Sequence, residues 1–195
     1  MRTFSCNNKM MIMLTALAVL GASRPVAART YTIDPVHSSV VFKISHLGVS
    51  QFYGRFNNPA GILEFDEQQP EKSRIEVTVM SKEIDTANEK RDTHLKSPDF
   101  FNIDVYPAIR FVSRQVQKAA ERNYLVSGEL TFLGVTKPLV VTGTYVGAGK
   151  DPWGGNRIGF ETAFTIRRSD FGMNFMPESL GDEVEIIVGI EGMGK

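Results

Sequence analysis

Hydrophobic and polar residues alternate with a period of two along most of this chain after residue 36, and Gly, Pro, Asn and Asp interrupt the alternation. This period is typical of β-strands that turn one face to an apolar core and the other to water. In one such segment, Ile158, Phe160 and Phe164 share a face. The pattern predicts eight strands, at residues 36–46, 54–65, 74–81, 108–115, 124–132, 136–146, 157–167 and 183–191, with 54–65 the weakest and interrupted.

The predicted strands follow one another along the chain, mostly without helical segments between them. A tight turn at Leu133-Gly134 joins two of them, and Asn88–Lys96 is the one charged, helix-compatible piece. This order favours an all-β antiparallel fold over a parallel sheet with crossover helices. A closed eight-stranded antiparallel barrel, as in lipocalins, removes exposed strand edges and can hold one small ligand. No repeat or linker divides the chain, so we expect one such barrel with a short helix in a long connection.

Two connections are longer than hairpins need, Lys82–Pro107 and Arg168–Asp182, and both are rich in apolar side chains. Connections of this length are uncommon and often cover a site. They predict either a pair of flaps over a cavity mouth or a plug that completes the core, and the sequence leaves both open. The candidate lid residues are Phe100, Phe101, Phe171 and Met173.

The N-terminal segment has the layout of a secretory signal peptide. Arg2 and Lys9 precede an apolar run at residues 10–22, and small residues follow up to Ala28. The run of 13 residues is too short to span a bilayer. We predict cleavage after Ala28, with Ser23 as the alternative, and export of the product to the periplasm.

Removing residues 1–28 changes the composition of what remains. The whole chain carries 22 basic and 22 acidic side chains, whereas residues 29–195 carry 19 and 22 and lose the single cysteine, Cys6. A mildly acidic surface argues against a nucleic-acid partner. The lack of cysteine excludes disulfides, thiol catalysis and thiolate metal sites from this barrel domain. None of its segments is apolar over 18 residues, so we expect no membrane span.

Sequence motifs of enzymes, phosphate-binding loops and dinucleotide-binding folds are absent. The histidines are His37, His46 and His94, and the first two would face opposite sides of one regular strand. We therefore expect no metal site, no cofactor and no enzymatic activity. One catalytic alternative is an enzyme that uses Asp92 or Asp99 with His94.

Short sequence blocks along residues 29–195 carry a family resemblance through their order and spacing. The blocks are Tyr31-Thr32-Ile33-Asp34 with His37-Ser38, His46-Leu47-Gly48, Gly54-Arg55-Phe56, Arg91-Asp92-x-His94-Leu95-Lys96-Ser97-x-Asp99-Phe100, Tyr106-Pro107-x-x-Arg110-Phe111, Gly128-x-Leu130-Thr131, Gly134-Val135-Thr136-Lys137-Pro138, Asp151-Pro152-Trp153-Gly154-Gly155, Asp170-Phe171 and Gly181-Asp182-Glu183-Val184. Together they resemble the YceI-like family of exported polyisoprenoid-binding proteins. The resemblance implies a lipocalin-like barrel, a polyisoprenoid or similar amphiphile in its interior, a periplasmic location and a homodimer.

These considerations together define the candidate ligand-binding residues. Strand parity makes Phe42, Phe160 and Phe164 candidates for the cavity wall, although ordinary core packing explains them equally well. The candidates near a polar head group are His46, Arg91 and His94.

The leading hypothesis is a carrier or sequestering protein for a lipid of the quinone or prenyl phosphate type. A stress-related structural or interaction module without a specific ligand is the main alternative, and the lipid-acting enzyme is the third.

Overall fold

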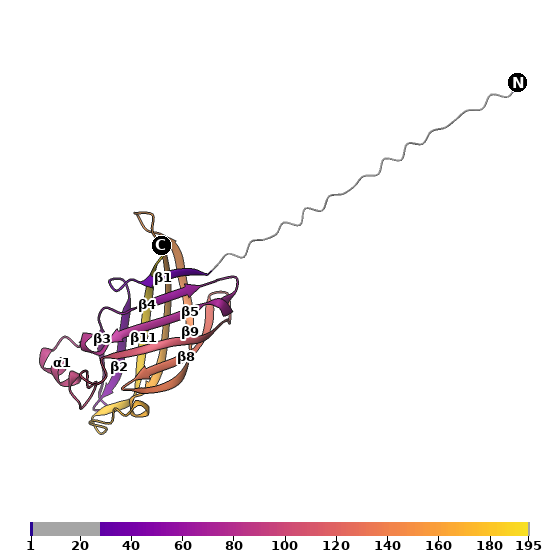
Figure 1. Cartoon of the computed structure of the whole chain (residues 1–195). Coiled ribbons are helices and arrows are strands. Elements are labelled where there is room, and N and C mark those ends of the chain that lie inside the picture. Colours follow the sequence, from indigo (N-terminus) through magenta and orange to yellow (C-terminus); the bar gives the residue numbers. More distant parts are fainter. Residues whose placement is uncertain (2–27, 195) are drawn as a thin grey trace.

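The computed structural model describes residues 1 and 28–194 (Figure 1), so the predicted signal peptide lies almost wholly outside the described residues. The strands are β1 (Arg29–Ile33), β2 (Ser39–His46), β3 (Ser50–Phe56), β4 (Ala60–Phe65), β5 (Arg74–Met80), β6 (Ile84–Asp85), β7 (Ala108–Lys118), β8 (Asn123–Phe132), β9 (Val135–Lys150), β10 (Asn156–Arg167) and β11 (Leu180–Gly194). The helix α1 spans Glu89–Lys96, and short 3-10 turns occupy Pro70–Lys72, Ser81–Glu83 and Arg168–Phe171.

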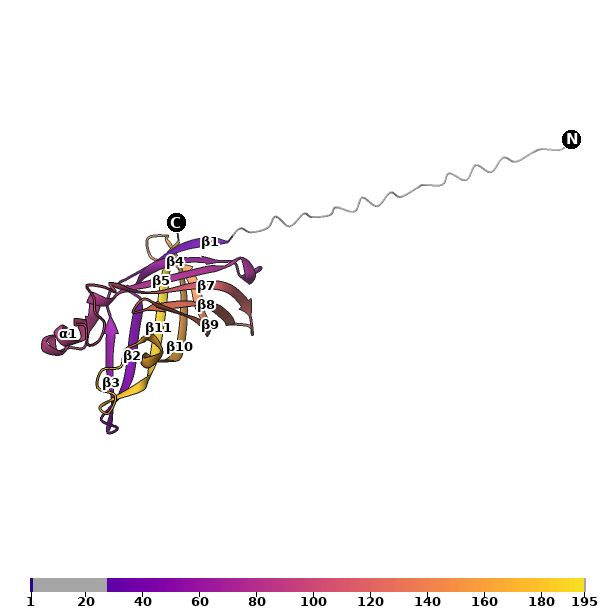
Figure 2. The same cartoon turned by 60° about the horizontal axis from the view of Figure 1, so that its bottom comes forward.

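Eight of the strands form a closed antiparallel ring in the order β1-β4-β5-β7-β8-β9-β10-β11. The ring closes because β1 pairs with β4 on one side and with the C-terminal end of β11 on the other. The rest of β11 pairs with β2, which continues the sheet through β3 to β6. Figure 2 shows β4, β5, β7 and β8 running across the direction of β2, β3, β10 and β11. The predicted eight-stranded antiparallel barrel with one short helix is confirmed.

The weak strand predicted at 54–65 is in fact two strands, β3 and β4. The chain turns between them at Asn57–Pro59, where Asn58 has a φ of 54° and the N–H of Asn57 donates to the carbonyl of Glu83. The strands β1 and β6 are additional to the prediction. Since β6 has two residues, it is too short to show any period.

Two local signals of the sequence are confirmed. Leu133 and Gly134 both have positive φ, as a two-residue hairpin between β8 and β9 requires. Asn88 caps α1, because its side chain accepts a hydrogen bond of 3.0 Å from the N–H of Arg91. Within residues 28–194, no helix is long and apolar enough to cross a membrane.

Three groups of buried side chains fill parts of the barrel interior. The largest lies where the connections 81–107 and 168–179 meet the barrel and includes Val40, Phe56 and Phe132. The second surrounds Ile33 at the seam between β1 and β11, and the third surrounds Val116 beside β8. All three groups contribute residues to the lining of one cavity.

Candidate functional site

A cavity of about 600 Å³ lies inside the barrel. This volume falls within the range of about 300–1,000 Å³ that is usual for ligand pockets. Its lining comes mainly from inward-facing apolar side chains of the barrel strands, together with residues of α1 and of the two long connections. The polar or charged side chains in the lining are His46, Ser50, Arg91, His94, Tyr124, Glu161, Thr162 and Arg168.

The three predicted wall residues, Phe42, Phe160 and Phe164, all line this cavity. Phe42 lies over Gly54 of the neighbouring strand, and a Cβ atom at Gly54 would come within 2.3 Å of the Phe42 ring. Phe160 packs edge-on against Phe65 with 5.0 Å between the ring centroids. The rings of Phe42 and Phe160 therefore combine packing on one side with a surface toward empty volume on the other.

Three of the four predicted lid residues, Phe100, Phe101 and Met173, are buried and line the cavity. Phe171 is also buried, but it does not line the cavity. Its ring packs against Phe132 with 5.4 Å between the centroids. The two long connections thus pack together like a plug and still border a hollow interior.

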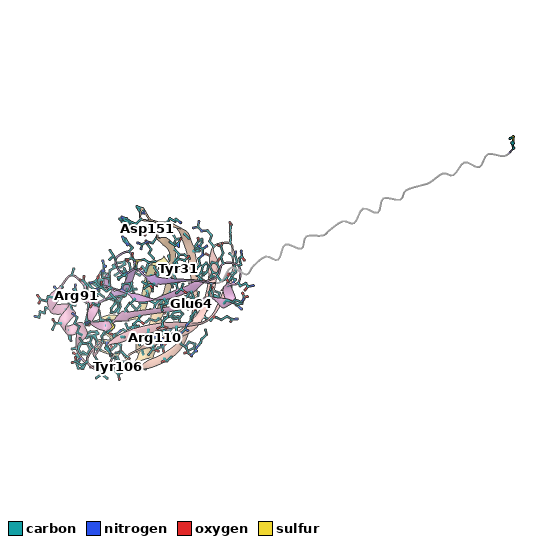
Figure 3. The ribbon with its side chains drawn as sticks, turned by 45° about the horizontal axis from the view of Figure 1, so that its top comes forward. Tyr31, Glu64, Arg91, Tyr106, Arg110 and Asp151 are labelled. Atoms are coloured by element: carbon teal, nitrogen blue, oxygen red, sulfur yellow. The ribbon has the colours of Figure 1, made fainter. Side chains whose placement is uncertain are left out.

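The predicted head-group residues His46, Arg91 and His94 all line the cavity on the side of α1. Arg91 is held in place because its Nε and Nη2 donate to the hydroxyl and carbonyl of Thr86, at 2.8 and 2.7 Å. Its guanidinium lies 4.4 Å over the centre of the Phe52 ring, which also lines the cavity. Figure 3 shows Arg91 on the α1 side of the barrel.

His94 connects the two long connections. Its Nε2 lies 2.9 Å from Oδ2 of Asp99, and its ring packs edge-on against Phe100 and Phe175. Asp92 does not join this pair, because its Oδ1 accepts hydrogen bonds from the N–H and the hydroxyl of Thr86. Of the two carboxylates in the catalytic alternative, the structure therefore brings only Asp99 to His94.

Arg168 is a buried cation in the lining that the sequence analysis did not identify. Its guanidinium donates to the carbonyl oxygens of Met173 and Phe175 in the connection between β10 and β11, at 3.2 and 2.8 Å. It also donates to those of Leu180 and Gly181 at the start of β11, at 3.2 and 2.9 Å. Burial lowers the pKa of this side chain from its usual value. Its position continues the inward-facing alternation of Phe160 and Phe164, whereas Arg167 falls on the exposed face, so strand parity is the signal that distinguishes the two arginines.

A network of charges near the start of β2 surrounds Arg157. Its Nη1 lies 2.6 Å from Asp34 and 3.3 Å from Glu191, and its Nε lies 3.0 Å from Asp151, which Figure 3 labels. His37 Nδ1 lies 2.9 Å from Asp34 Oδ2. Asp34, His37 and Glu191 are close enough to surround a cation, but the Arg157 guanidinium already places a positive charge between the two carboxylates.

His37 and His46 are separated as predicted, but not because they face opposite sides of one strand. Because β2 begins at Ser39, His37 precedes the strand and His46 ends it. The two histidines therefore lie at opposite ends of β2, and not on opposite faces of it.

Comparison with known proteins identifies the family of this barrel. Residues 31–192 match the model of the YceI-like domain. The chain belongs to the YceI-like family. Its relatives include UPF0312 proteins of Photorhabdus laumondii, 40% identical over 187 residues (95% of this chain and 97% of the relative), and of Azotobacter vinelandii, 39% identical over 178 residues (90% and 92%).

Solved structures of similar fold include a YceI protein of Campylobacter jejuni, 30% identical with a TM-score of 0.68, covering 78% of this chain and 91% of that one. BcnA of Burkholderia cenocepacia, 21% identical, has a TM-score of 0.75 over 82% of this chain and 98% of BcnA. A polyisoprenoid-binding domain from Saccharophagus degradans implicated in plant cell wall breakdown, 13% identical, has a TM-score of 0.67 over 85% and 98%. The predicted YceI-like family and fold are confirmed.

Proposed function

We propose that this YceI-like protein holds a polyisoprenoid or a similar long-chain amphiphile inside its barrel, as a periplasmic carrier or sequestering protein. The observation that carries the proposal is the cavity of about 600 Å³ with its predominantly apolar lining. The fold similarity to a polyisoprenoid-binding domain supports the same class of ligand.

The physical basis of such binding is the transfer of an apolar chain out of water. Each buried CH₂-sized group contributes up to about 0.8 kcal/mol, so a few isoprene units suffice for tight binding without any bond chemistry. A flexible chain loses conformational freedom in the cavity, which reduces this gain. Branched prenyl chains pack well against the rings of Phe42, Phe160 and Phe164, which face the empty volume.

A polar head group would lie on the α1 side of the cavity, beside His46, Arg91 and His94. Arg91 offers a fixed positive charge there, because Thr86 and the Phe52 ring hold its guanidinium in place. Quinone oxygens and prenyl phosphates both accept hydrogen bonds, so either head group fits the donors present.

Native mass spectrometry of protein purified from the periplasm of the organism that makes it, followed by lipid extraction, tests this proposal. We expect a bound species whose mass matches a polyisoprenoid or another long-chain amphiphile, recovered at close to one per barrel. Protein that carries no lipid and takes up no added prenyl lipid would refute the proposal and favour the structural or interaction module.

The contact between His94 and Asp99 is the one observation that favours the catalytic alternative, since a carboxylate can orient an imidazole for proton transfer. We expect the binding protein to release its lipid chemically unchanged after prolonged incubation. Conversion of the lipid by the parent protein, lost in His94→Ala and Asp99→Asn, would establish an enzyme instead.

The periplasmic location and the homodimer remain predictions from the leader and from the family resemblance. Fractionation of cells tests the first, and light scattering of the purified protein tests the second.

A further inference from the structure

The strands β9 and β10 separate part of the way along the barrel wall. They pair from Lys150 and Asn156 as far as Thr144 and Glu161, and no further. Before Thr144, β9 pairs only with β8, and after Glu161, β10 pairs only with β11. Residues 136–143 and 162–167 therefore form two strand edges that face each other without a ladder of hydrogen bonds, and we call the space between them the β9–β10 slot.

Few interactions bridge the β9–β10 slot. The hydroxyl of Thr162 donates to the carbonyl of Thr142 at 2.8 Å near one end. Near the other end, Lys137 Nζ lies 3.6 Å from Asp170 and 6.0 Å from the centre of the Phe171 ring. Both members of that ion pair are substantially exposed, so the pair contributes little to stability. Pro138 lies on the β9 edge, and proline suits a strand edge that donates no hydrogen bond.

Apolar side chains from both edges of the slot line the cavity. Leu139 and Val141 come from β9, and Phe164 and Ile166 come from β10. The exposed residue Glu161 lies at the end of the slot and belongs to the same lining. The cavity therefore reaches the outer surface of the barrel beside the slot.

The same cavity also reaches the surface on the side of α1. There the lining includes His46 and Ser50, both exposed and both in the hairpin formed by β2 and β3. In the sheet, β11 and β2 lie between β10 and β3. The two surface openings therefore lie on opposite sides of the part of the wall formed by β10, β11 and β2.

We propose that the β9–β10 slot is a second opening of the ligand cavity, through which the end of a long apolar chain passes. The inference rests on the proposed lipid-binding function and adds a rule of specificity to it. A cavity closed at one end excludes tails longer than itself, whereas one open at both ends accepts them. The head group lies beside Arg91, and tail length is unrestricted because the slot lets the surplus chain leave.

The packing of the two long connections makes the slot the easier route for the chain end. Phe100, Phe101 and Met173 are each less than 10% exposed, so separating the connections disrupts buried contacts. Widening the slot disrupts one hydroxyl hydrogen bond, one exposed ion pair and the contact of Lys137 with the Phe171 ring.

Gly143 gives a clean way to obstruct the slot. It lines the cavity at the point where the strands separate, and a Cβ atom there would meet its nearest neighbours at 3.9 Å, an ordinary contact distance. Gly143→Leu therefore adds bulk at the slot without straining the strand. Gly147→Leu is the matched control, because it lies on the same strand, outside this lining, with nothing within 4 Å of an added Cβ.

The experiment measures the affinity of each protein for two ubiquinones with the same head group, one with two isoprene units and one with eight. The readout is the ratio of the two dissociation constants. We expect Gly143→Leu to shift this ratio against the long tail by at least about tenfold, the effect of losing two buried methylene-sized groups. Gly147→Leu keeps the ratio within about twofold of the parent protein.

Short-tail binding also reports whether the variants fold. If Gly143→Leu does not fold, Val141→Phe obstructs the slot from the neighbouring inward-facing position, with the same expected shift. An unchanged ratio in a folded slot variant would overturn the second opening while leaving lipid binding intact. Failure of the parent protein to bind either ubiquinone would overturn this inference together with the quinone form of the proposed function.

Discussion

At the scale of single residues, the contact between Phe42 and Gly54 shows how one missing side chain shapes the cavity wall. The Phe42 ring occupies the space where a Cβ atom of residue 54 would stand, at 2.3 Å. We expect Gly54→Ala to displace this ring and to lower the free energy of unfolding by about 1–3 kcal/mol, the usual cost of overpacking. Urea denaturation measures the loss.

Gly189→Ala is the matched control for this substitution. Gly189 is also a strand glycine, but an added Cβ there meets nothing within 4 Å. Its effect should stay within about 0.5 kcal/mol. Equal effects of the two substitutions would show that Phe42 does not depend on the space at Gly54.

The hydroxyl of Tyr124 is a buried polar group that lacks a hydrogen-bond partner among the described residues. Burial raises the pKa of the side chain. An unsatisfied buried hydroxyl costs about 1–3 kcal/mol. Tyr124→Phe should therefore leave stability unchanged or increase it by about 1 kcal/mol in chemical denaturation. A clear loss would reveal a partner for the hydroxyl.

At the scale of structural elements, Arg168 ties the connection between β10 and β11 to the start of β11 through four carbonyl oxygens. Arg168→Met leaves these carbonyls without their donors, and we expect unfolding to become easier by about 2–5 kcal/mol. Hydrogen exchange should increase first in residues 168–180.

Arg167→Met provides the comparison for Arg168→Met. Arg167 is mostly exposed and lies 4.0 Å from an exposed Glu183, so its removal should cost less than about 0.5 kcal/mol. Similar losses for the two arginines would contradict the structural role of Arg168.

How far the sequence predicts the elements depends on their length and environment. Long strands such as β10 show their period clearly because many alternate residues face the interior, and Asn88 marks the start of α1 with a local cap. The two-residue strand β6 carries no period, and the turn at Asn57–Pro59 is too short to separate β3 from β4 by pattern alone.

In the candidate site too, the sequence predicts the features that depend on local alternation and misses those that depend on contacts between distant segments. Strand parity placed Phe42, Phe160 and Phe164 in the cavity lining, because parity depends only on the local alternation. The carbonyl contacts of Arg168 and the β9–β10 slot depend on where strands distant in sequence stop pairing. Local patterns hold no information on such long-range geometry.

At the scale of the whole molecule, the hydrogen bond between His37 and Asp34 makes stability depend on pH. This bond, together with hydrogen bonds from the N–H of Val36 and from Arg157, lowers the pKa of Asp34 from 3.8 to about 2, and Asp34 in turn raises the pKa of His37 above 6.5. The contribution of Asp34 is present above pH 4 and is lost as the pH falls toward 2. That of His37 is present below pH 6.5 and is lost as the pH rises through its higher folded-state value.

His37→Gln tests this dependence. We expect the substitution to lower the free energy of unfolding more at pH 5 than at pH 8.5, because the contribution of charged His37 is fully present below pH 6.5 and decreases as the pH rises. Urea denaturation of both proteins across this range measures the difference. An effect of the same size at both pH values would contradict a charged contact.

The position of β11 in the sheet determines when the barrel can form. This last strand of the chain pairs with β10, with β2 and with β1, so neither the ring nor its extension is complete without it. During synthesis, β1 can pair with β4 and β2 with β3, but the edges that these strands turn toward β11 stay unpaired until residues 180–194 emerge. Contacts between such distant segments also slow folding. The topology thus leaves the barrel of the growing chain open, and its ligand cavity incomplete, until β11 has been made.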